Sequence, residues 1–442
     1  MTARRVCCAL FALIVWMLLS PLAAGEPVDR EGFVKAFVEK ADLVKAFEER
    51  VAAAETDVSR AKWQYFPKLK LTFGMAPFPK YTYNPDEVDW DKSYYIGDLG
   101  IALRAKGELT IPIYTFGKIG NAIDAAEKGV GVRRAEKELS VLTLRKEAAS
   151  FYYAYVMAND MQNILELSLE KVGEAEEKLD RWLYEGKEGV SQSDLIKLRI
   201  EKERLLAALD KVATTKETLN ALFEKILGPG YAPKDEFMFK VEFPYTLAQL
   251  ESRLIGDSPY QRLVTNGLGA LESLYKLERS QFFPNLGMAG NYRIDYTSSV
   301  DDRGYPLPDS PYNGYGGEVG IGIEFNLNIL DQVARTRKAK AEWQARSYEA
   351  SFAKEAALLE LRRRYDELRA LESRVEHART AHKLAKGWMT TEMMNYEVGM
   401  FSTRDLVDSV KAFVENEYEL IAAMYEYNMK AEELMSSAGV TP

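Results

Sequence analysis

The sequence contains one short stretch twice, as WQYFPKLKLTFGM at residues 63–75 and as SQFFPNLGMAGNY at residues 280–292. In each copy an apolar pattern with helical spacing comes before the Phe-Pro pair, and an alternating pattern comes after it. Proline ends a helix because its nitrogen has no hydrogen to donate and its ring clashes with the preceding turn. Each copy therefore marks the passage from a helix to a strand.

Two further pairs of segments match in the same order. IPIY at residues 111–114 corresponds to FNLN at residues 325–328, and the turn after Tyr184 corresponds to the turn after Tyr396. A chain that repeats the order helix, strand, strand, very long helix, turn and helix is a duplicated unit. The predicted fold class is mixed and predominantly α. The first repeat is predicted at 26–230, with a β-hairpin at 67–113 and a helical hairpin at 118–227. An inter-repeat linker or equatorial region follows at 231–258, and the second repeat is predicted at 259–438, with a β-hairpin at 284–330 and a helical hairpin at 331–437.

Residues 1–25 have the pattern of a secretory signal peptide. Arg4 and Arg5 come first, an apolar core runs from Ala9 to Leu19, and small residues precede a cleavage site after Gly25. A membrane anchor is the alternative, but the apolar stretch is too short to span a bilayer comfortably. Both cysteines of the chain lie inside this segment, so the exported part has no thiol for a disulfide or a metal site.

Composition argues against several classes of function. The formal net charge is −9, and there is no basic stripe of the kind that binds nucleic acid. The chain has two histidines, His377 and His382, which we interpret as solvated residues on a helix face and not as zinc ligands. The sequence offers no grouping of nucleophile, base or metal ligands, so we expect no enzymatic activity and no cofactor.

Four segments alternate apolar and polar side chains with the period of a β-strand. They are residues 69–75, 99–113, 286–294 and 319–329. Half-buried hairpins of a soluble sheet are the plain interpretation. However, the strands are predicted to run roughly 12–15 residues, well above the five or six of an ordinary strand. Apolar faces of this length suit a wall that spans a bilayer around a polar lumen.

The helical segments are longer still. Residues 29–64 are predicted to form one amphipathic helix, and 118–183 and 331–397 continue without a proline. At about 1.5 Å per residue each of the two long helices would extend on the order of 100 Å, which implies coiled-coil packing. The shorter helices expected are two return helices at 191–227 and 402–437 and a small helix starting near Thr246.

Four amphipathic strands in one chain cannot close a membrane barrel, because the narrowest barrels have about eight. Open edges in hydrocarbon leave backbone groups unpaired at several kcal/mol each. Other copies of the chain must therefore complete the wall. Three copies would give twelve strands, although strand counting alone does not choose the trimer over a dimer or a tetramer. The alternative is a periplasmic or surface coiled-coil scaffold without a pore, which leaves the lipid-compatible strand faces without a purpose.

The chain resembles the outer-membrane efflux protein family typified by TolC along essentially its whole length after the signal peptide. The resemblance rests on Phe-Pro-x-Leu at 66–69 and 283–286, on PIYTFG at 112–117, and on YEVG at 396–399 with Ser402, Asp405 and Leu406. It implies a homotrimer in which a twelve-stranded transmembrane β-barrel joins a twelve-helix coiled-coil α-barrel. It also implies a location in the outer membrane of a Gram-negative bacterium, with the helices extending into the periplasm.

Members of this family are passive exit ducts of tripartite efflux pumps or type I secretion systems. The resemblance therefore implies a channel that is opened at its periplasmic helix tips by a periplasmic adaptor (membrane fusion) protein and an inner-membrane pump. The expected partners are these two proteins, two further copies of the chain and the lipid bilayer, and no nucleic acid. Drug efflux, metal efflux and protein secretion are not distinguished by the sequence.

Asp405 and Asp408 stand three residues apart just after the second tight turn. This spacing places both carboxylates on one face of a helix, and around a threefold axis they would form two stacked rings. Like charges in such rings raise one another's proton affinity and attract cations. The arrangement matches the acidic constriction at the periplasmic entrance of TolC-like proteins. The simpler interpretation is an acid pair that favours a helix N-terminus, and both can hold.

The resemblance also implies a latch that holds neighbouring helix tips shut. Tyr396 and Asp194 occupy the positions of the latch tyrosine and aspartate, whereas the latch arginine is replaced by Phe401, with Arg404 close by. Ser191 and Ser402 are placed as N-caps, and two glycines compete for the single glycine of the first turn. The helix-tip turns expected to contact the adaptor contain Gly186, Gly189, Ser191, Gly399 and Ser402.

Overall fold

The computed structural model describes residues 27–79, 99–187, 191–229, 231, 233–298, 313–325, 327–398 and 402–440. The predicted signal peptide, much of the two loops between paired strands, and the turn residues Gly189, Gly399 and Phe401 lie outside the described residues. The chain divides into two units. The helical unit comprises residues 1–48, 135–262 and 352–442, and the strand unit comprises residues 49–134 and 263–351.

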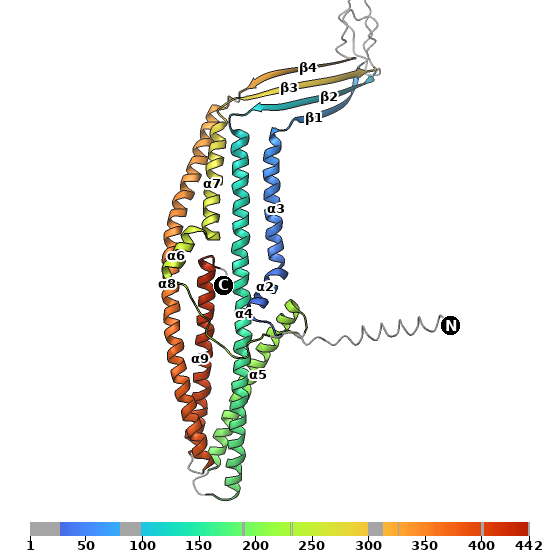
Figure 1. The fold of residues 1–442 in the computed structure, drawn as a ribbon. Coiled ribbons are helices and arrows are strands. Elements are labelled where there is room, and N and C mark those ends of the chain that lie inside the picture. The colour runs from blue at the N-terminus through green and yellow to red at the C-terminus, as the bar shows by residue number, and fades with distance from the viewer. Residues whose placement is uncertain are drawn as a thin grey trace, which may run out of the picture. The chain divides into compact units, whose positions relative to one another are not determined.

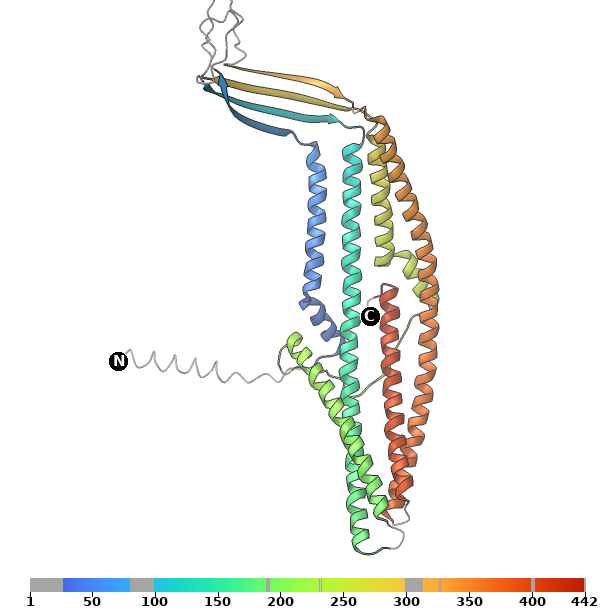
Figure 2. The same ribbon diagram turned by 180° about the vertical axis from the view of Figure 1, so that it is seen from behind.

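The strand unit contains one antiparallel sheet. Its strands are β1 (Lys68–Pro79), β2 (Leu99–Tyr114), β3 (Asn285–Thr297) and β4 (Gly314–Glu324), in the order β1-β2-β3-β4. They lie side by side in one layer in both views (Figures 1 and 2). The hairpins of the two repeats are joined by pairing between β2 and β3. The strands are 12, 16, 13 and 11 residues long, which confirms the prediction of unusually long strands.

The two faces of this sheet differ in polarity, as the alternation predicts. On one face the aligned residues Lys70, Glu108, Asn291 and Glu318 form a polar row, and Arg104 is bonded to Asp295 at 2.5 Å. The other face carries large apolar side chains that are exposed in the single chain: Leu69, Leu71, Phe73, Met75, Leu103, Ile294, Val319, Ile321 and Ile323. Contiguous apolar surface of this kind marks a surface that is covered by lipid or by a partner.

The fourth strand ends earlier than the alternation predicts. Residues 319–329 alternate throughout, but β4 stops at Glu324, and the helix α8 begins at Ile329. The partner of Glu324 is Asn285, the first residue of β3, which follows Pro284. Because proline has no N–H to extend the ladder, β3 offers β4 no partner beyond Glu324. The predicted strand character of Phe325, Leu327 and Asn328 is wrong for this reason, and Asn326 lies outside the described residues. The helix α8 begins two residues before the predicted start at 331.

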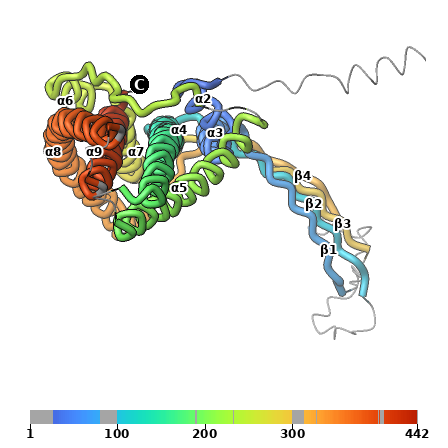
Figure 3. Tube along the Cα trace, turned by 90° about the horizontal axis from the view of Figure 1, so that it is seen from below, coloured from blue at the N-terminus to red at the C-terminus, as the bar shows by residue number. Residues whose placement is uncertain are grey.

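The helical segments follow the predicted order. α4 (Lys118–Tyr184) and α8 (Ile329–Glu397) have 67 and 69 residues and run from the strand unit into the helical unit. The return helices are α5 (Gln192–Leu227) and α9 (Thr403–Ser437). Within the part of the chain that the structure describes, no helix combines the length and apolarity that crossing a membrane requires. Seen from below, α4 lies beside α5 and α8 lies beside α9 (Figure 3).

The first helical segment is broken, contrary to the prediction of one helix over 29–64. It forms α2 (Arg30–Lys40) and α3 (Asp42–Lys62), followed by the short 3₁₀ helix η1 (Trp63–Tyr65). Between them Ala41 has an extended conformation, with φ −70° and ψ 115°. Lys40 and Asp42 suit this break, because a cation favours the C-terminus of one helix and an anion favours the N-terminus of the next. Lys40 also donates to the carbonyl of Ile226 in α5.

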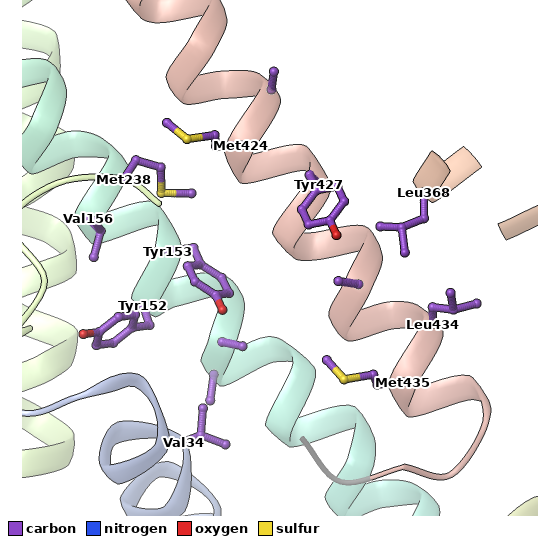
Figure 4. Close-up of a cluster of buried hydrophobic side chains, with 14 of the residues drawn as sticks. Val34, Tyr152, Tyr153, Val156, Met238, Leu368, Met424, Tyr427, Leu434 and Met435 are labelled. Carbon is purple, nitrogen blue, oxygen red and sulfur yellow. The ribbon is translucent and has the colours of Figure 1, made fainter. Parts of the chain in front are cut away.

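The core of the helical unit is built around aromatic and methionine side chains. Tyr152 and Tyr153 of α4 are fully buried and lie near Met238, Met424 and Tyr427 (Figure 4). The hydroxyl of Tyr152 donates to Asp235 at 2.6 Å. This core therefore joins α4 and α9 to the segment between the repeats, which runs from residue 231 to 258.

The segment between the repeats is fastened by side chains of the helices that it crosses. Asn428 of α9 is fully buried, and its amide donates to the carbonyl of Phe239 at 2.7 Å and accepts from the N–H of Val241 at 2.9 Å. Asp160 of α4 accepts from the N–H of Met238. The small helix predicted near Thr246 is α6 (Leu247–Gly256), and Thr246 closes its N-terminus in a capping box with Gln249. α7 (Pro259–Ser280) follows and leads into the second hairpin.

Asn428→Ala is expected to destabilise the helical unit by about 3 kcal/mol, because it leaves two backbone groups of the crossing segment without partners in a buried site. Thermal unfolding followed by circular dichroism measures the effect. The control is Asn416→Ala on the same helix, since the Asn416 amide donates to the carbonyl of Ala412 within α9. Equal losses of stability in the two variants would show that Asn428 does not fasten the crossing segment.

Candidate functional site

The helix tips of the helical unit bring the two repeats together. α4 ends and α5 begins at one turn, and α8 ends and α9 begins at the other. The four helices share a cluster of buried apolar side chains: Leu165, Val172, Leu179, Leu195, Leu198, Tyr396, Leu406 and Val410. A change in the position of either turn would therefore disturb the packing of both hairpins.

Gly186 ends α4 in the left-handed conformation, with φ +67°. The N–H of Lys187 donates to the carbonyl of Trp182 at 3.0 Å, and the N–H of Gly186 donates to that of Leu183 at 3.3 Å. This bond pair is the Schellman motif, which favours glycine because a Cβ is strained at positive φ. Of the two glycines that compete for the turn, Gly186 closes the helix, and Gly189 lies outside the described residues.

The predicted N-caps are confirmed in both hairpins. The hydroxyl oxygen of Ser191 accepts from the N–H of Asp194 at 3.3 Å, and that of Ser402 accepts from the N–H of Asp405 at the same distance. The Ser191 hydroxyl also donates to the Asp194 carboxylate at 2.6 Å. This bond, together with Lys197, holds the pKa of Asp194 below its usual range. Asp194 is therefore a charged residue at the start of α5, where the helix N-terminus favours an anion.

Tyr396 is buried at the end of α8 and bonds to α4. Its hydroxyl donates to the carbonyl of Ala175 at 2.9 Å, and its ring lies 5.2 Å from that of Trp182. Burial raises the pKa of Tyr396, and the negative charge of Asp194 raises it further. The structure thus brings the two predicted latch residues within electrostatic reach of each other inside one chain. Their predicted role between neighbouring copies stays a prediction.

Trp182 is a tip residue that sequence reasoning missed. Trp182 is buried, and two ammonium groups lie close to its ring, with Lys187 Nζ 3.8 Å and Lys178 Nζ 5.0 Å from the ring centroid. Lysines over the face of an indole ring are attracted by the negative charge of that face. The only signal in the sequence is an aromatic residue in the last turn of α4, and this alone does not distinguish a tip contact from ordinary core packing.

The two aspartates of the predicted acidic rings lie at the start of α9. Both are exposed in the single chain and lie three residues apart on one helical face. Asp408 Oδ2 is 3.7 Å from Arg404 Nε, and both side chains are more than half exposed. An exposed ion pair at this distance is weak, so it leaves most of the negative charge at this position uncompensated.

The histidine prediction is correct for one residue and wrong for the other. His377 is exposed on α8. The side chain of His382 is only 19% exposed and contacts the carboxylate of Glu417 on α9. The charged residues around both histidines predict a solvated helix face, but His382 lies on the side of α8 that contacts α9.

Comparison with known proteins identifies the fold. No family model and no curated protein matches the sequence. Among solved structures, the outer-membrane channel CmeC of Campylobacter jejuni matches 93% of this chain and 85% of its own length, with a TM-score of 0.74 and 15% identity. The outer-membrane protein VceC of Vibrio cholerae matches 93% of this chain and 96% of its own, with a TM-score of 0.72 and 13% identity. The open-state outer-membrane channel MtrE of Neisseria gonorrhoeae matches 96% of this chain and 93% of its own length, with a TM-score of 0.72 and 13% identity.

The fold is that of the TolC-like outer-membrane channels. The TolC-like fold confirms the predicted fold class of a predominantly helical chain with a duplicated strand-strand-helix-helix unit. The similarity covers 85% to 96% of the length of these proteins, so it concerns the fold of nearly the whole chain. At this level of identity the similarity concerns the fold and not the side chains at the tips.

Proposed function

We propose that the chain is the outer-membrane channel of a tripartite efflux pump, a passive conduit that three copies form together. The observation that carries the proposal is the sheet of the strand unit. One face is apolar and exposed over the length of four long strands, and the opposite face is polar and charged. An apolar outer face and a polar lumen are the signature of strands that span an outer membrane.

The sheet has two open edges, β1 and β4, in the single chain. In a bilayer each unpaired backbone group at these edges would cost several kcal/mol. Pairing of β4 with β1 of the next copy removes both edges from lipid, and three copies complete a wall of about twelve strands, within the range of known barrels. The alternative of a coiled-coil scaffold without a pore leaves the apolar face without a partner.

The helices serve as the periplasmic part of the conduit. In this proposal the tips of α4, α5, α8 and α9 meet their counterparts in the other copies and close the passage. Asp405 and Asp408 form the acidic constriction, and Asp194 and Tyr396 hold the tips in the closed arrangement. A periplasmic adaptor contacts the two tip turns and opens the passage together with an inner-membrane pump. These turns contain Gly186, Gly189, Ser191, Gly399 and Ser402. A type I secretion system would use the same constriction, latch residues and tip turns.

Disulfide crosslinking of the two edge strands tests the proposed assembly. The chain after residue 25 has no cysteine, so any disulfide that forms must join two introduced cysteines. Lys70→Cys on β1 is combined in turn with Gly316→Cys, Glu318→Cys, Gly320→Cys and Gly322→Cys on β4, all on the polar face. We expect covalent trimers from at least one register, because a disulfide needs Cα atoms within about 7 Å.

The matched control moves the first cysteine to Lys106 on the inner strand β2. This position lies on the same face but at no edge, so it should give no crosslinked oligomer with any of the β4 cysteines. Absence of trimers in every β1–β4 register, or equal crosslinking from the inner strand, would contradict the proposed wall.

Tyr396→Phe is expected to favour the open state about fivefold, since losing one hydrogen bond costs about 1 kcal/mol. The bond removed is that to the carbonyl of Ala175, and the ring packing stays. Planar-bilayer recordings and antibiotic sensitivity of cells measure the leak. Tyr418→Phe on α9 is the control, because Tyr418 is exposed. A closed-state conductance equal to that of the unmodified protein would reject Tyr396 as a latch.

A further inference from the structure

A cluster of buried titratable side chains lies in the helical unit away from the proposed gate. It consists of His382 on α8, Glu417 on α9 and Asp160 on α4. The side chains of His382 and Glu417 are 19% and 12% exposed, and Asp160 is 5% exposed. Nδ1 of His382 contacts a carboxylate oxygen of Glu417, and the His382 ring packs against Phe413 with its centroid 5.7 Å away.

The groups that act on this pair come from two helices and from the segment between the repeats. Asp160 of α4 acts on Glu417, and Lys386, one turn beyond His382 on α8, acts on both members of the pair. Asp160 itself accepts from the backbone N–H of Met238 at 3.0 Å. In the described part of the chain no group of three or more His, Cys, Asp and Glu side chains could hold a metal ion. The side chains of this cluster can gain and lose protons, and their arrangement does not match that of a metal site.

A contact between an imidazole nitrogen and a carboxylate oxygen requires a proton between them, because otherwise two lone pairs face each other. Burial raises the pKa of Glu417 to about 7, and the nearby charge of Asp160 adds to this effect. Burial lowers the pKa of His382, and Lys386 lowers it further. Both shifts favour the uncharged pair, in which the carboxyl group of Glu417 donates its proton to Nδ1 of a neutral imidazole.

We propose that Glu417 and His382 hold a single proton in a buried site shared by α4, α8 and α9, and that its loss above neutral pH loosens the packing of these helices. Without this proton the Glu417 carboxylate faces the lone pair of His382 and the carboxyl group of Asp160. Like charges in a buried place repel strongly because little water screens them. The repulsion pushes α9 away from its two neighbours.

The direction of the pH dependence follows from the two shifts. Glu417 has a folded pKa above its unfolded value, so its contribution to stability is full below the unfolded value and is lost as the pH rises through about 7. His382 has a folded pKa below its unfolded value, so its contribution is present at neutral pH and is lost as the pH falls below that lowered value. The packing is therefore tightest while the pair holds one proton. This property belongs to the helical unit and holds whether or not the chain forms a channel.

Histidine NMR tests the shared proton directly, because the chain has only two histidines. His377, exposed on the same helix, is the internal control. In protein labelled with ¹³C in the histidine rings, the chemical shifts of the two rings are followed separately as the pH is raised from mildly acid to mildly alkaline values. His382 should keep the signature of a neutral ring at mildly acid pH and shift only near pH 7, when Glu417 releases its proton.

The variant Glu417→Gln is the second part of the experiment, since glutamine keeps the shape of the protonated acid but has no proton to release. We expect the His382 shift near neutral pH to disappear in this variant. Amide hydrogen exchange, corrected for intrinsic rates, should rise about fivefold around His382 and Glu417 of the unmodified protein between pH 6 and 8, because about 1 kcal/mol of packing is lost. Glu417→Gln should show no rise. Identical titrations of the two histidines, or an unchanged His382 titration in Glu417→Gln, would overturn the proposal.

Discussion

Replacement of Ile321 by lysine is expected to abolish assembly of the protein in the membrane. Ile321 is 72% exposed in the C-terminal half of β4, on the apolar face of the sheet. A lysine that faces lipid near the bilayer midplane costs about 2–4 kcal/mol. In a wall of three copies this cost occurs three times, which is enough to reduce assembly by several powers of ten.

The adjacent residue provides a matched control. Gly320 lies on the opposite face of the same strand, and a Cβ added there meets no atom within 4 Å. Gly320→Lys therefore adds the same charge one position away, toward the proposed lumen, and should assemble normally. Membrane fractionation with an alkaline wash, followed by gel analysis of the oligomer, measures both variants. If both lysines are tolerated, or neither is, the apolar face is not the lipid-facing surface.

Asp405→Ala combined with Asp408→Ala is expected to weaken block of the channel by multivalent cations at least about tenfold and to reduce its cation selectivity. In a threefold assembly these residues supply six carboxylates to one constriction, and closely spaced like charges attract cations strongly. The change should leave the helix start intact, because it is the backbone N–H of Asp405, and not its carboxylate, that Ser402 caps.

Glu415→Ala tests whether this effect is specific to position. Glu415 is an exposed acid on the same helix, beyond Asp408 and away from the turn. Planar-bilayer recordings with a trivalent cation should show unchanged block for this variant and strongly reduced block for the double aspartate variant. Block that stays the same without Asp405 and Asp408 would remove both residues from the constriction.

Much of the fold could be predicted because its signals are local and occur twice. Alternation of apolar residues predicts the strands, and the absence of proline predicts the long helices. The N-caps Ser191 and Ser402 need only their own hydroxyls and the N–H groups three residues on. The error in the length of β4 has its cause in another segment of the chain. β4 stops at Glu324 because β3 begins after Pro284, and this limit is set more than thirty residues away in the sequence.

The details of the candidate site were harder to predict because they depend on packing between distant segments. Tyr396 donates to a main-chain carbonyl of Ala175, which no residue pattern reveals. The approach of Lys187 to the Trp182 ring depends on how the turn after α4 folds back. The contact of His382 with Glu417 depends on which side of α8 faces α9. Side chains that act through such contacts become visible only when the helices are placed together.

The number of chains in the membrane-extracted protein tests the central claim most directly. That claim is that the four strands of one chain are an incomplete wall which other copies must finish. Native mass spectrometry of the protein extracted in detergent and transferred to lipid nanodiscs gives this number without reference to function. The expected result is three chains per particle, with detergent or lipid required to keep them in solution. A single chain that stays folded and dissolved without either would contradict the account.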